Sequence, residues 1–145
     1  MLNCSLAKRR RWYAAKVEAC LLHEALDALW GFVGEANRFV ESEQPWHLAK
    51  AARAGEPGAQ ERLEGVLGDL LESCRVISLA SAPFLPGTAA LAAEQLGLAY
   101  GYGADGSGGP RLADAVRWGA AVESSGAIGT VAPLFPRLEA DVPAA

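Results

Sequence analysis

Residues 22–50 read LHEALDALWGFVGEANRFVESEQPWHLAK, a long helical pattern that ends at a Pro-Trp pair. Residues at three- and four-residue steps form one stripe along the predicted helix: Leu22, Leu26, Leu29, Val33, Asn37 and Val40. Pro45 disfavours helical geometry at Gln44 but suits the first position of a new helix. The stretch therefore predicts a helix, a break and a second, short helix over 45–54, with Trp46 in its first turn.

The sequence on both sides of this stretch is also helical in character. No proline occurs from Leu6 to Glu43, which fits one helix or two helices parted between Ala19 and Glu24. After Pro57 a second long stripe follows steps of four and three residues: Leu63, Leu67, Leu70, Cys74, Ile77, Ser81 and Phe84. The acids on its other side predict a solvated face: Glu61, Glu64, Asp69 and Glu72. PFLPG at 83–87 ends this helix, and a shorter one is expected over 88–96.

Three parts follow from this pattern. Residues 1–16 form a basic helix or an irregular segment, 17–98 a helical bundle, and 99–145 a Gly-rich loop, a short helix and an extended tail. Nothing in the sequence has the alternation of a sheet, so the predicted fold class is all-α with an irregular C-terminal tail.

Composition limits the classes of function. A chain of 145 residues, 51% of them apolar, suits one domain with a real core. A net charge of −4 argues against holding nucleic acid by bulk electrostatics, so any such partner must be bound locally. Three widely spaced cysteines fit free thiols in a reducing compartment. No apolar run could span a bilayer, and the protein is expected to be soluble and cytoplasmic.

The sequence offers no convincing catalytic or metal-binding constellation. Gly101, Gly103 and Gly106 satisfy G-x-G-x-x-G, but the strand and the helix that this phosphate site needs are missing, which favours a flexible loop. His23 and His47 stand on different predicted helices and pair with no nucleophile. We therefore expect no catalytic residue, metal ligand or cofactor in this chain.

Two positions near the Pro-Trp pair are candidates for binding. Asn37 is an amide within an apolar stripe, with Arg38 beside it, and it either braces the turn around Gln44 or contacts a ligand. Trp46, fixed by Pro45, is either a wedge between helices or a platform on which a nucleic-acid base stacks. The residues alone favour bracing for Asn37 and the wedge for Trp46.

The N-terminal run of Lys8, Arg9, Arg10 and Arg11 is the one concentrated basic patch, followed by Trp12 and Tyr13. Such a run fits contact with an RNA backbone, although a charge run is more often merely solvated.

Three stretches carry a family resemblance when they are taken in order. They are residues 24–50, residues 62–98 (RLEGVLGDLLESCRVISLASAPFLPGTAALAAEQLGL), and Trp118-Gly119 with the closing LFPRLE at 134–139. Together they resemble the anticodon-binding domain of methionyl-tRNA synthetase, a class I enzyme, over Val17 to Glu139. The N-R-[aromatic]-x5-P-W-x-L-A-K element at 37–50 is the specific part, whereas the second stretch is shared in character with related synthetases.

The resemblance implies a helical bundle that reads the methionine anticodon of tRNA. It places Trp46 against the first anticodon base, with Pro45 setting its orientation, and reverses the preference for a wedge. Asn37 and Arg38 are further candidate RNA contacts, as are Arg9, Arg10 and Arg11. The family also uses an asparagine and an arginine on a first helix, and residues 1–16 do not match their spacing.

The synthetase motifs H-I-G-H and K-M-S-K-S have no counterpart in these residues. The chain resembles a C-terminal piece of the enzyme and is expected to be inactive alone, whether it is an excised fragment, a truncated reading frame or a separate module. In the complete enzyme, methionine is attached to tRNA with ATP, and a catalytic domain would be a partner. The alternative is a non-catalytic helical module that binds another protein through its apolar stripe and tail.

Overall fold

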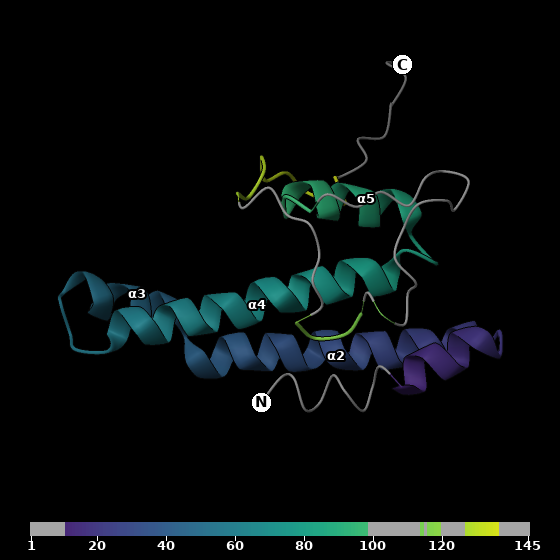
Figure 1. Cartoon of the computed structure of the whole chain (residues 1–145), viewed down its shortest axis with the longest axis horizontal. Coiled ribbons are helices and arrows are strands. Elements are labelled where there is room, and N and C mark those ends of the chain that lie inside the picture. Colours follow the sequence, from purple (N-terminus) through teal and green to yellow (C-terminus); the bar gives the residue numbers. More distant parts are fainter. Residues whose placement is uncertain (1–10, 99–113, 115, 120–126, 137–145) are drawn as a thin grey trace, which may run out of the picture.

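The computed structural model describes residues 11–98, 114, 116–119 and 127–136. Four labelled helices make up most of this part (Figure 1): α2 (Leu22–Glu43), α3 (Pro45–Arg53), α4 (Ala59–Ser81) and α5 (Pro86–Gln95). Residues 11–18 form a further helical segment before α2. The described residues contain no β-strand, and the all-α prediction is confirmed.

The helix α4 is the centre of the bundle. It contacts α2, α3 and α5. Figure 1 shows α2 and α4 running side by side in opposite directions, with α5 on the other side of α4 and α3 beside its N-terminal end. The chain thus turns back at the α2–α3 junction, which places the Pro-Trp pair at one end of the bundle.

The long proline-free stretch is two helices, parted inside the predicted interval. Cys20 has a left-handed φ of 57°, and α2 begins at Leu22. Across this break, Lys16 Nζ lies 2.7 Å from Glu24 Oε2. The hydrogen bond from Lys16 holds the pKa of Glu24 below its ordinary value.

The core between α2 and α4 combines alanines with a few larger side chains. The core includes Tyr13, Ala25, Ala28, Leu29, Phe32, Val76, Leu79, Ala80 and Val116. Tyr13 donates its hydroxyl hydrogen to the Ala80 carbonyl at 2.5 Å. The observed face is offset from both predicted stripes, and Leu22 and Leu67 are exposed. Ala25, Ala28 and Ala80 in this face let the two helices approach closely beside the larger core residues Phe32 and Leu79.

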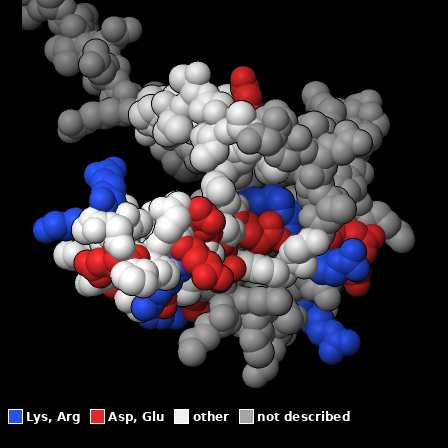
Figure 2. Space-filling view, turned by 60° about the vertical axis from the view of Figure 1, so that its left-hand side comes forward, with Lys and Arg blue, Asp and Glu red and all other residues white. Residues whose placement is uncertain are grey.

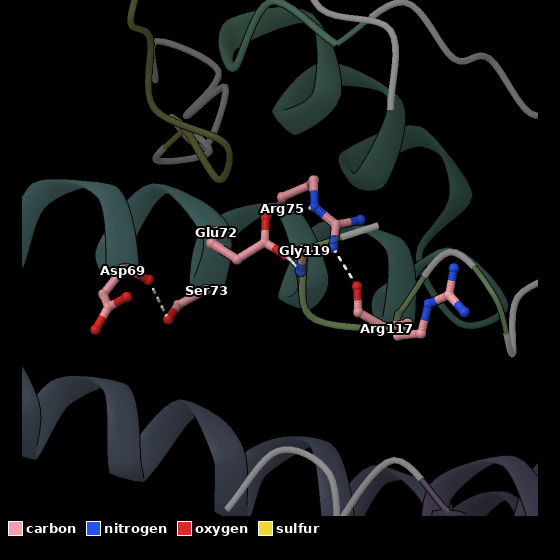
Figure 3. A network of polar contacts seen from close by, with 6 residues as sticks. All are labelled: Asp69, Glu72, Ser73, Arg75, Arg117 and Gly119. Atoms are coloured by element: carbon pink, nitrogen blue, oxygen red, sulfur yellow. Dashed lines mark hydrogen bonds and ion pairs between the residues drawn. The ribbon is translucent and has the colours of Figure 1, made fainter. Parts of the chain in front are cut away.

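An ion pair between the buried Arg75 and the partly buried Glu72 attaches residues 116–119 to α4 (Figure 3). Arg75, only 5% exposed, donates from Nε and Nη2 to the two Glu72 carboxylate oxygens at 2.7 and 2.6 Å. Arg75 Nη2 also donates to the Arg117 carbonyl, and the Gly119 N–H donates to Glu72 Oε1. The prediction that Glu72 belongs to a solvated face is therefore wrong, because these two donors hold its carboxylate.

Residues 127–136 lie beside α5 without helical structure, in agreement with the predicted irregular tail. The Gly129 N–H donates to the Gln95 carbonyl at 2.8 Å, and Gln95 Nε2 donates to the Ala132 carbonyl at 2.9 Å. The predicted Gly-rich loop at 99–110, the basic residues Arg9 and Arg10, and residues 137–145 lie outside the described residues. Within the described part, no helix combines the length and apolarity needed to cross a membrane.

Candidate nucleic-acid interface

The turn between α2 and α3 is built on Gln44. This residue has φ 48° and ψ 60°, and its N–H donates to the Val40 carbonyl at 3.0 Å, which ends α2. Its own carbonyl accepts from the His47 N–H at 2.8 Å and so begins α3. Pro45 is the first residue of α3, where no hydrogen bond from its nitrogen is needed. The predicted break and short helix are confirmed.

Trp46 stands out from the bundle in the first turn of α3. Its side chain is 54% exposed, and its ring contact is with the neighbouring His47, at 6.2 Å between centroids and 54° between planes. The helix is held against α4 by a different face, which carries half-buried residues: Pro45, Leu48, Ala49, Ala51 and Ala52. An indole that wedges helices apart would be enclosed, whereas this one has a face open to solvent.

Two cations share the exposed face of α3 with Trp46. Lys50 and Arg53 follow it by four and seven residues, a spacing that returns to the same side of a helix. Both are exposed, and α3 contains no acidic residue. Within the described part of the chain, neither forms an ion pair with a carboxylate. Sequence reasoning did not select these cations, although their helical spacing from Trp46 was a usable signal.

The carboxylate of Glu43, two residues before α3, is paired with an arginine. Arg62 Nη2 lies 2.9 Å from Glu43 Oε2, which joins the last residue of α2 to the first turn of α4. Figure 2 shows this end of the molecule turned forward, with acidic side chains in the middle of the described surface and Lys and Arg side chains mostly towards its edges, apart from one basic group beside the central acids. The basic groups are thus local features of an acidic protein.

The other candidate residues are placed differently. Asn37 is exposed, so the expectation of an amide buried in the stripe is wrong, because the buried face of α2 is offset from that stripe. Arg38 is also exposed, and its Nη1 lies 3.6 Å from the point that a Cβ at Gly34 would occupy. Both residues precede Pro45 by about 10 to 12 Å along the axis of α2. Arg11 is exposed in the helical segment 11–18, and Figure 1 shows this segment beside the N-terminal part of α2, away from α3.

The described residues contain no group of three or more histidine, cysteine, aspartate or glutamate side chains that could hold a metal ion. Fold and surface together define an all-α bundle that carries an aromatic and basic face on a short helix at one end.

Comparison with known proteins gives the family. The chain is 30% identical over 133 residues to the methionine–tRNA ligase of Oceanobacillus iheyensis, a match that covers 92% of this chain and 18% of that protein. It is 35% identical over 82 residues to the corresponding ligase of Clostridium perfringens, covering 57% of this chain and 12% of that protein. With the ligase of Clostridium tetani it shares 32% identity over 96 residues, 66% of this chain and 14% of that protein.

The chain belongs to the methionine–tRNA ligase family. It spans less than a fifth of the length of these relatives. A scan against models of protein families gives no match.

Proposed function

We propose that the chain binds the anticodon loop of methionine tRNA, as the recognition segment of a methionine–tRNA ligase. The observation that carries this proposal is the exposed indole of Trp46 on a helix whose solvent face is otherwise basic. Single-stranded nucleic acid is bound by such combinations, in which an aromatic ring stacks on a base and cations accompany the backbone. The family membership supports tRNA as the partner.

Stacking supplies affinity rather than sequence discrimination. A base on an aromatic platform contributes about 1 to 3 kcal/mol, and every base offers a π-face. Hydrogen bonds to base edges must therefore tell the methionine anticodon from others. Asn37 and Arg38 remain proposed contacts because both are exposed near the same end of α2. Arg9, Arg10 and Arg11 remain proposed backbone contacts.

The chemistry of the complete ligase would lie outside this segment. We propose that methionine and ATP are bound by a catalytic domain, and that this chain contributes tRNA recognition without a cofactor of its own. Protein synthesis places that activity in the cytoplasm.

Fluorescence polarisation with a labelled methionine-type anticodon hairpin tests the proposal. Trp46→Ala is expected to weaken binding by about 5- to 150-fold, the equivalent of about 1 to 3 kcal/mol. Trp30→Ala is the matched control, because Trp30 is 59% exposed but lies on α2. A hairpin with a changed first anticodon base reports specificity. Equal affinity of wild type and a folded Trp46→Ala variant would remove Trp46 from the site.

A second candidate function, docking of another protein, is favoured by exposed apolar side chains. Leu67 and Leu71 on α4 and Leu91 on α5 are 44%, 45% and 50% exposed. Leu71 also lines a groove of about 340 Å³, together with Leu96, Leu98 and Ile128 among others. A catalytic domain of the same family is the partner that we propose for this surface. Binding there should change little with salt, whereas RNA binding should weaken as salt rises.

A further inference from the structure

We infer that α3 is a backbone-tracking helix, in which Lys50 and Arg53 neutralise two phosphates of the same RNA strand whose base stacks on Trp46. This inference rests on the proposed RNA binding and adds to it a definite number of phosphate contacts and the residues that make them. It concerns affinity and salt dependence, and it assigns Lys50 and Arg53 no part in reading the sequence.

Helix geometry gives the spacing. With a rise of about 1.5 Å per residue, the Cα atom of Lys50 lies about 6 Å beyond that of Trp46 along the axis of α3, and that of Arg53 about 10 Å beyond it. All three side chains leave the helix on one side and are exposed. A strand that continues from a base on Trp46 therefore passes along both cations within the reach of their side chains.

Lys50 and Arg53 form no ion pair with a carboxylate of the described residues, and Glu56, the first acid after α3, is exposed three residues beyond Arg53. The helix has no acidic residue, and the carboxylate of Glu43, just before it, is paired with Arg62 at 2.9 Å. The whole chain has a net charge of −4, which repels RNA, so these two cations supply a local positive charge on an otherwise acidic protein. The opposite face of α3 is occupied by its contact with α4, and the strand is confined to the solvent side.

A purely structural role is the alternative. Lys50 and Arg53 lie in the last turn of α3, where positive charge also favours the negative end of the helix dipole. That role predicts a small loss of stability when they are removed and no change in how RNA binding depends on salt. The two roles therefore differ in the slope of log affinity against log salt that each predicts for the variants.

The experiment is a salt series of polarisation titrations with the labelled methionine-type hairpin. Wild type is compared with Lys50→Ala, Arg53→Ala, the double variant and Trp46→Ala. Lys16→Ala is the matched control: it removes one positive charge, but its partner Glu24 lies about 28 Å along α2 from Glu43. Circular dichroism and thermal unfolding establish that each variant is folded.

Each of the two substitutions on α3 should reduce the slope of log affinity against log salt by about 0.7, and the double variant by about 1.4. Affinity should fall about 5-fold per contact near 0.1 M salt, equally for matched and changed hairpins. Trp46→Ala should lower affinity with the slope unchanged. Lys16→Ala should leave both unchanged.

A double variant that binds the hairpin with the wild-type slope would overturn the inference and leave the proposed RNA binding intact. A slope that falls equally in Lys16→Ala would also overturn it, because the effect would then be one of net charge. If wild type bound neither hairpin at any salt concentration, the proposed function itself would fail and the inference with it.

Discussion

Gln44 is the residue that lets one helix end and the next begin without a loop. Its left-handed φ of 48° is a conformation that glycine adopts freely and residues with a Cβ adopt at a cost. Pro45 requires the break, since it disfavours a right-handed helical residue before it. The exposed direction of Trp46, two residues later, depends on this turn.

We expect Gln44→Gly to raise the free energy of unfolding by about 0.5 to 1 kcal/mol, because the strain relieved exceeds the added flexibility of the unfolded chain. Urea denaturation followed by circular dichroism measures the change. Gln44→Ala keeps the Cβ and should give no such gain. A Gln44→Gly variant less stable than wild type would show that the turn is not strained at this residue.

At single residues, sequence reasoning succeeded where the backbone chemistry is strict. Proline at 45 predicted both the end of α2 and the start of α3, because its ring leaves few alternatives. It failed at Asn37, which it assigned to the apolar stripe of the helix although the residue is exposed. A hydrophobic stripe identifies a helix but does not settle which flank of the stripe is buried.

At the scale of elements, the helices were predictable and their exact contacts were not. The stripes over 22–40 and 63–84 predicted α2 and α4, and the glycine and proline signals predicted α5. The buried faces are offset because Ala25, Ala28 and Ala80 allow close packing. Such packing depends on the partner helix, which a periodicity within one helix does not contain.

The ion pair between Glu72 and Arg75 was also missed, because the backbone groups that complete its hydrogen bonds lie more than forty positions away in the sequence. Gly119 and Arg117 complete it through their backbone atoms. In sequence alone, Glu72 is one of several acids on a polar side. The structure instead makes it the point at which the segment 116–119, with the buried Val116, is held on α4.

Glu72→Ala should lower the free energy of unfolding by about 2 to 4 kcal/mol, because it removes the carboxylate from a buried guanidinium and from the Gly119 N–H. Chemical denaturation measures this loss. Glu64→Ala is the control: Glu64 is an exposed acid of α4 that accepts a hydrogen bond from Gln60 Nε2 at 2.7 Å, and removing it should lower the free energy of unfolding by no more than about 0.5 kcal/mol. Equal losses in the two variants would contradict the assigned role of Glu72.

At the scale of the whole molecule, the net charge is negative, whereas the proposed RNA-binding face of α3 is positive. A chain of charge −4 repels RNA at a distance, so recognition by such a protein must come from short-range contacts. The proposed role of the α3 face that carries Trp46, Lys50 and Arg53 combines stacking with local positive charge. Family membership was visible in the sequence because the Pro-Trp element and the second long helix occur in the family's order.

The most direct test of the account is the ¹⁵N–¹H spectrum of the four tryptophan indoles during titration with the methionine-type hairpin. Trp46→Phe assigns the signal of Trp46, and Trp30→Phe assigns that of the exposed control. The account predicts that the Trp46 signal shifts on RNA binding while the Trp30 signal stays in place. Binding of the hairpin with no shift at Trp46 would contradict it.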